Sequence, residues 1–239
     1  MGEGCGSDAE LMPFISSANI ACGYHAGDAD TMKRTIDLAL ENGVAIGAHP
    51  GYADRENFGR TNMNLATREV YDIVTDQVVA LNEIVVQSGG RLSHVKPHGA
   101  MYNQAARDAE LAMAIAEAVR NFDDSLVLFG LANSLSISTA ASLGLKTANE
   151  VFADRTYQTD GSLTPRTQQN AMIDDETIAV NQVLDMIKYG RVRSTEAIMS
   201  KITADTVCIH GDGEHAVNFA RAINSELRRN GVTILAING

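Results

Sequence analysis

The sequence predicts an α/β protein: a single domain over residues 1–239, in which seven parallel strands form a closed or nearly closed (β/α) barrel. Short apolar segments alternate with amphipathic segments of helical period along the whole chain, which is typical of parallel strands joined by helices. No G-x-G-x-x-G fingerprint opens a helix, which disfavours an open dinucleotide-binding sheet. No linker or low-complexity tract divides the chain, so we expect one domain.

The first half of the chain predicts three strands, in the segments SANIACGYHAGD, GVAIGAHPGYAD and RLSHVKPHG. Between the first two we expect a helix over 28–42, with Asp28 or Asp30 as N-cap and Gly43 as its stop. A polar loop then precedes a longer helix, whose apolar residues recur at helical spacing over 70–85 before SGG.

The second half continues the alternation with four strands, in SLVLFG, LKTANEVFAD, DTVCIHGD and VTILAI. Helices are expected from residue 108, over 134–143, around 178–187 and over 217–227. The polar segment 155–173 is consistent with a lid or with an assembly surface, and the sequence does not decide between them.

The composition is that of a soluble globular protein, with 45% hydrophobic and 21% charged residues. A net charge of −11 disfavours nucleic-acid binding and adhesion to anionic membranes, but a local cationic cluster would still bind a small anion. The N-terminus has no signal-peptide pattern, and the longest apolar run, LVLFGLA, is too short to span a bilayer. Three cysteines without metal or disulfide spacing favour the cytoplasm, and we interpret two of them as buried hydrophobes: Cys22 and Cys208.

Four of the six histidines end an apolar strand and are followed by glycine within two residues: His25, His49, His98 and His210. Lys96 lies two residues before the third of them, and Asp154 closes the EVFAD strand. The carboxyl ends of parallel strands lie on one face of the fold, where active sites usually form. We therefore expect these side chains to converge in one pocket.

Each of these residues also has a structural interpretation. A lone strand-end histidine is more often structural than catalytic, and Asp28 by itself is more often an N-cap. Asp212 is open to interpretation as a turn or cap residue, and His94 and His215, which lack the pattern, are interpreted as structural. The recurrence of histidine before glycine is what favours a site.

Such a set of residues suits hydrolysis of an amide, an ester or a related bond. Histidine and aspartate supply general acid and base, and lysine or arginine holds a carboxylate or an oxyanion. Two or three histidines with an aspartate could instead hold a metal that activates water. The sequence has neither a G-x-x-x-x-G-K-[ST] loop nor a G-x-S-x-G elbow.

Seven motifs resemble those of the LamB/YcsF family and follow its order over nearly the whole chain: SANIACGYHAGD, GVAIGAHPGYAD, FGR, HVKPHGAMYN, EVFADRTY, GSLTPR and CIHGD. The resemblance implies a β/α barrel related in shape to the polysaccharide deacetylases. It also implies the activity of the A component of 5-oxoprolinase, the ATP-dependent opening of 5-oxoproline to L-glutamate with subunits B and C. ATP would bind together with Mg²⁺, either on this chain or on the partner subunits. The resemblance does not decide whether the chain binds a metal of its own or forms a homo-oligomer.

Residue chemistry assigns hypothetical roles at the positions that match these motifs. We expect a catalytic set comprising His25, His49, Asp28, Lys96, His98 and Asp154. We expect a substrate-binding set comprising Glu3, Arg60, Arg155, Arg166, His210 and Asp212. In this hypothesis His25 or His49 is the general base, oriented by Asp28 or Asp154, and the same two histidines would hold any metal.

The chain departs from the family pattern at its start. The family usually has a strand reading Asp-Leu-Asn-x-Asp before the Gly-Glu-Gly turn, whereas Met1 stands directly before Gly2 here. We therefore expect a barrel without its first strand and with neighbouring strand edges left unpaired. Two alternatives to the lactam-opening enzyme remain: a metal-dependent deacetylase-like hydrolase, which the missing aspartate disfavours, and a noncatalytic ligand-binding subunit, which the missing strand favours.

Overall fold

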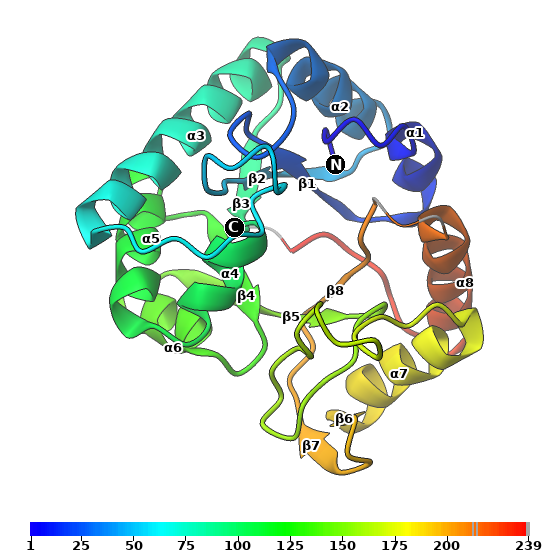
Figure 1. Ribbon diagram of the computed structural model, residues 1–239. Helices are drawn as coiled ribbons and strands as arrows, with labels where there is room; N and C mark the ends of the chain where they lie inside the picture. The colour runs from blue at the N-terminus through cyan, green and yellow to red at the C-terminus, as the bar shows by residue number, and fades with distance from the viewer. Residues whose placement is uncertain (212, 214, 238–239) are drawn as a thin grey trace.

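A six-stranded parallel sheet forms the centre of the computed structural model, which describes residues 1–211, 213 and 215–237. Its strands follow one another in chain order, each paired in parallel with the next: β1 (Ser17–Ala21), β2 (Ala45–His49), β3 (Leu92–Val95), β4 (Val127–Leu131), β5 (Lys146–Phe152) and β8 (Thr206–Cys208). The sheet curls into a half-barrel with its helices on the outside (Figure 1). The predicted α/β barrel class is confirmed.

The helices follow the predicted alternation: α1 (Asp8–Leu11), α2 (Ala29–Glu41), α3 (Thr67–Gln87), α4 (Gly99–Ala105), α5 (Ala109–Phe122), α6 (Leu135–Ser142), α7 (Glu176–Tyr189) and α8 (Ala216–Arg229). A 3₁₀ turn, η1 (Met12–Phe14), follows α1. α2 begins where the Asp28 carboxylate accepts the Thr31 N–H at 2.8 Å, and it buries Met32 and Ile36 against the sheet. No helix among the described residues is long and apolar enough to cross a bilayer.

Both faces of the central strands are buried. Every residue of β3 and β4 is buried, with helices packed on the outer face of the sheet. Inside the half-barrel the ring of His94 stacks on Phe129 at 4.2 Å between centroids, and its Nε2 lies 3.0 Å from the Asn19 side-chain oxygen. These contacts agree with a structural role for His94.

The sheet is open between β1 and β8, its two edge strands. Met1 lies along the β1 edge, where its amino group donates to the Asn19 carbonyl and its own carbonyl accepts the Ala21 N–H, both at 2.9 Å. The expected open sheet is observed, but Met1 pairs with part of the β1 edge that was expected to be unpaired.

The predicted strand at VTILAI is wrong. Residues 232–237 form no strand, and Ile237 packs against the inward-facing Val127, Phe129 and Ala148 of β4 and β5. None of these residues is fully buried, and Leu235 is 73% exposed, so the run is a partly exposed irregular segment that periodicity could not distinguish from a short strand. A hairpin that the sequence did not reveal joins β6 (Arg191–Arg193) to β7 (Met199–Lys201).

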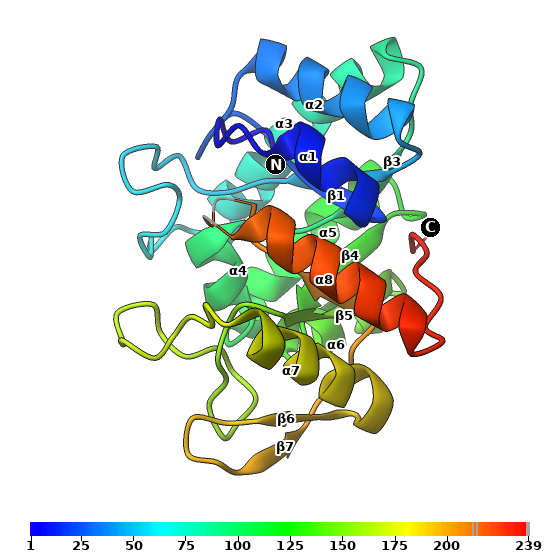
Figure 2. The same ribbon diagram turned by 90° about the vertical axis from the view of Figure 1, so that its right-hand side faces the viewer.

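The loop after β2 and the polar segment 155–173 project from one end of the half-barrel, and the C-terminal segment lies toward the other (Figure 2). The projecting end is that of the carboxyl termini of the strands, so the fold brings the predicted strand-end residues to one side of the molecule.

Candidate functional site

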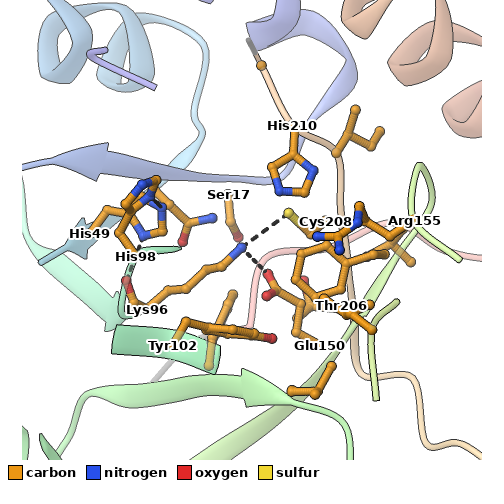
Figure 3. Close-up of a pocket in the computed structure, with 18 of the residues that line it drawn as sticks. Ser17, His49, Lys96, His98, Tyr102, Glu150, Arg155, Thr206, Cys208 and His210 are labelled. Carbon is orange, nitrogen blue, oxygen red and sulfur yellow. Dashed lines mark hydrogen bonds and ion pairs between the residues drawn. The ribbon is translucent and has the colours of Figure 1, made fainter. Parts of the chain in front are cut away.

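A cavity of about 990 Å³ extends from the carboxyl ends of the strands through the half-barrel and along the opening between β1 and β8. Its lining includes eight of the residues expected from the sequence: Glu3, His49, Arg60, Lys96, His98, Arg155, Arg166 and His210. Lys96 lies between the His49–His98 pair on one side and His210 with Arg155 on the other (Figure 3). The strand-end residues therefore converge, as their shared position before glycine predicts.

Three imidazole rings form the first group of the site. His25 follows β1 and stacks face to face on His98, the N-cap of α4, with 3.8 Å between ring centroids. His49 ends β2, and its Nε2 lies 3.0 Å from His98 Nδ1. The Glu3 carboxylate lies 3.4 Å from His25 Nε2 and 3.9 Å from His98 Nδ1.

Glycines let the backbone close around these rings. A Cβ on Gly51 would lie 2.9 Å from His25 Nδ1 and 3.2 Å from His98 Cβ. A Cβ on Gly99 would overlap the Gly59 carbonyl oxygen, so the turns after β2 and β3 can meet only without side chains. Phe58, at a positive φ of 57°, aims its carbonyl oxygen at His98 Nε2, 2.8 Å away.

Burial sets the charge of this group. Desolvation, followed by the neighbouring His25, lowers the pKa of His98 to about 3. Desolvation, followed by His98 and Lys96, holds the pKa of His49 well below its usual range. Burial opposes ionisation of Glu3, but the N-terminal ammonium group and His25 outweigh it and lower its pKa to about 2. Near neutral pH the site thus presents neutral His49 and His98 rings beside a carboxylate.

A buried ion pair forms the centre of the cavity. Lys96 Nζ lies 2.8 Å from Glu150 Oε1 and donates a hydrogen bond to Cys208 Sγ at 3.1 Å (Figure 3). The ammonium group also lies over the Tyr102 and Phe152 rings, 5.6 and 5.2 Å from their centroids. Burial disfavours the charge, but Cys208 and Glu150 outweigh it and raise the pKa of Lys96, so this side chain remains a cation.

His210 and Asp154 form the third group. The carboxylate of Asp154 accepts from His210 Nδ1 at 2.8 Å, which assigns the Nδ1 proton to this bond and leaves Nε2 as the nitrogen that can accept a proton in the neutral form of the ring. Burial disfavours the Asp154 charge, but the hydrogen bond from His210 outweighs it and lowers the pKa of Asp154. An imidazole held by a carboxylate in this way is suited to act as a general base.

The three arginines have different positions. Arg155 is buried, and its guanidinium donates to the carbonyls of Ala171 and Thr164, so it holds the segment 155–173 in place. Burial, followed by the charge of Arg166, lowers the pKa of Arg155 to about 10. Arg60 and Arg166 are exposed at the edge of the cavity, where Arg60 lies over the Phe58 ring at 4.9 Å.

Several predicted roles need correction. Asp28 is the exposed N-cap of α2 and bonds to Thr31, so its carboxylate serves the helix rather than a catalytic histidine. Asp154 orients His210 instead of His25 or His49. His25 lies behind His98 and does not line the cavity, because stacking buries its ring. Asp212 lies outside the described residues.

Glu150 is the principal residue that sequence reasoning missed. A glutamate inside the apolar strand segment ANEVF is a signal in itself, because a carboxylate in a buried strand needs a cationic partner. Cys208 is buried as expected, but it also contacts the Lys96 ammonium group.

The LamB/YcsF family model matches residues 1–239. The crystal structure of a lactam utilization protein from Thermus thermophilus is similar over 97% of this chain and 93% of that one, with 40% sequence identity and a TM-score of 0.91.

Proposed function

The chain belongs to the LamB/YcsF family, and from this premise we propose that it is the lactam-binding subunit of an ATP-dependent 5-oxoprolinase, acting with subunits B and C. The reaction would open 5-oxoproline to L-glutamate in the cavity at the strand ends. The observation that carries the proposal is the buried Lys96 cation, which lies between the His49–His98 pair and His210, the partner of Asp154.

The substrate needs a cation and the cavity supplies one. 5-Oxoproline carries a carboxylate and an amide oxygen on a small ring, and both are hydrogen-bond acceptors. Lys96 would donate to one of these oxygens from a position where water cannot screen the interaction. Arg60 and Arg166 would attract the carboxylate at the edge of the cavity.

The attacking water needs a base, and we assign that role to His210. Asp154 accepts the Nδ1 proton, so Nε2 would take the proton from water and later return it to the leaving nitrogen. This differs from the expectation from sequence, in which His25 or His49 was the base. Those two rings lie in the more deeply buried group beside Glu3.

ATP would make the amide carbonyl reactive. Transfer of the γ-phosphoryl group to the lactam oxygen activates the ring carbon, and water then adds there. The C–N bond breaks as the nitrogen takes a proton, which leaves an acyl phosphate. A second water releases L-glutamate and phosphate, so one ATP and two waters give ADP, phosphate and the amino acid.

Release of glutamate from 5-oxoproline tests the proposal. We expect turnover only when the chain, subunits B and C, ATP and Mg²⁺ are all present, and loss when any one is omitted. His210→Gln should lower kcat by about 100-fold or more, as removal of a general base does, whereas His215→Gln on the exposed N-cap of α8 serves as the matched control. Binding of 5-oxoproline without turnover in the complete mixture would support the noncatalytic binding subunit instead.

A further inference from the structure

The two facing histidine nitrogens in the cavity both lack a proton. His49 Nδ1 lies 2.6 Å from the Lys96 carbonyl oxygen, and His98 Nε2 lies 2.8 Å from the Phe58 carbonyl oxygen. A carbonyl oxygen only accepts, so each of these nitrogens carries its ring's hydrogen. The remaining nitrogens, His49 Nε2 and His98 Nδ1, therefore direct lone pairs at each other across 3.0 Å.

Two lone pairs at this distance repel unless a cation lies between them. A single proton would bond to one ring only, whereas a metal ion accepts both lone pairs and leaves the two N–H groups on their carbonyl partners. Glu3 adds a carboxylate to the same point, and the ligand atoms of Glu3, His49 and His98 all lie within 4.8 Å of one another. We propose that these three residues bind one divalent transition-metal ion, with Zn²⁺ as the reference case.

The geometry fits such an ion with small adjustments. With metal–nitrogen bonds of about 2.0–2.1 Å, a nitrogen separation of 3.0 Å gives an angle near 94° at the metal. A tetrahedral ion needs about 3.35 Å, so the rings would separate by about 0.3–0.4 Å. Glu3 must move closer, and its loop allows this because a Cβ added to Gly4 or Gly6 beside it would have no neighbour within 4 Å.

The surroundings of the two rings are those of metal ligands. Metal-bound histidines usually donate their other N–H to a carbonyl or carboxylate, which fixes the ring and its tautomer, and both rings here do so. The stacked His25 ring and the close approach of Gly51 hold the His98 plane in position. Glu3, His49 and His98 all line the cavity, so the remaining coordination positions face the space where a substrate would bind.

The donor set also selects the class of metal. Two imidazole nitrogens with one carboxylate suit zinc, cobalt, nickel or iron, whereas Mg²⁺ prefers oxygen ligands and remains associated with ATP phosphates. A metal here would supply Lewis-acid chemistry to a bound carbonyl or water. The proposal does not depend on lactam opening, because the isolated chain is sufficient for metal binding.

Titration of the chelator-treated chain with Zn²⁺ and Co²⁺ tests this inference. We expect one ion per chain, and a visible Co²⁺ spectrum that is removed by competing Zn²⁺ and unaffected by Mg²⁺. His98→Gln and Glu3→Gln should each weaken binding more than tenfold, whereas His215→Gln, an exposed histidine outside the cavity, should not. Thermal melting checks that each variant is folded.

A second measurement keeps the test decisive if His98→Gln does not fold. Nitrogen-15 NMR of the wild-type imidazoles should place protons on His49 Nδ1 and His98 Nε2, and Zn²⁺ should shift the two unprotonated nitrogens. The inference is overturned if the folded wild-type chain binds neither Zn²⁺ nor Co²⁺ at micromolar concentration. It is also overturned if the spectra place a shared proton between the two rings.

Discussion

Replacement of Glu150 by glutamine should strongly destabilise the fold, because it leaves the Lys96 ammonium group buried without its counter-ion. The Lys96 and Glu150 side chains are only 7% and 2% exposed, so solvent cannot replace the lost partner. Removal of one member of such a pair costs about 3–5 kcal/mol. Cys208 Sγ and two aromatic faces still contact the ammonium group, so we expect a value near the lower limit, about 3 kcal/mol.

Urea unfolding of Glu150→Gln, Lys96→Met and the double variant measures this effect. In the double variant no unpaired charge remains, so its loss of stability should be smaller than the sum of the two single losses by at least about 1 kcal/mol. The reasoning is refuted if Glu150→Gln loses less than about 1 kcal/mol, or if the two single losses add within error.

Three further predictions concern hydrogen bonding and packing in the segments that follow the strands. The hydrogen bond from His210 lowers the pKa of Asp154 below its unfolded value of 3.8. The ionised Asp154 carboxylate therefore stabilises the fold above pH 3.8, and this contribution is lost as the pH falls through the lower pKa of the folded state. In Asp154→Asn, stability followed by circular dichroism should decrease less steeply as the pH is lowered. Gly51→Ala should lower the free energy of unfolding by about 1–3 kcal/mol and reduce turnover, because its Cβ would lie 2.9 Å from a histidine ring. The control is Gly211→Ala, whose Cβ has its nearest contact at 3.4 Å and should change the melting temperature little. Equal effects of the two substitutions would contradict the packing argument. Asp28→Ala should lower the melting temperature through the lost cap but leave kcat unchanged, and a large fall in kcat would restore this residue to the catalytic set.

The alternation of strands and helices could be predicted because the periodicity is strong. The helix expected over 28–42 occupies Ala29–Glu41, and the apolar repeat over 70–85 lies within Thr67–Gln87. The final segment could not be assigned, because only Ile237 packs against Phe129, whereas Val232 and Ile234 pack against another part of the core and Leu235 is exposed. A partly exposed, unpaired apolar run has the same local sequence pattern as a short strand.

The convergence of the strand-end residues could also be predicted, because a parallel sheet collects its carboxyl ends on one side. Which side chains pair with one another within the site could not be predicted. Asp154 bonds to His210, 56 residues away in the sequence, and Lys96 pairs with Glu150 of β5. Both pairings depend on the register of neighbouring strands. Stacking of His25 behind His98 likewise depends on glycines from two other turns, which no local pattern reveals.

The most direct test of the account is glutamate release by the complete complex assembled with Lys96→Met, beside Lys33→Met as the matched control. Lys33 is exposed on α2, where it pairs with Asp37, and it does not line the cavity. We predict that Lys33→Met supports wild-type turnover, and that folded Lys96→Met loses at least about 100-fold in kcat/KM because the cation that binds the lactam oxygens is gone. Wild-type turnover by the folded Lys96→Met complex would contradict the placement of the substrate in this cavity.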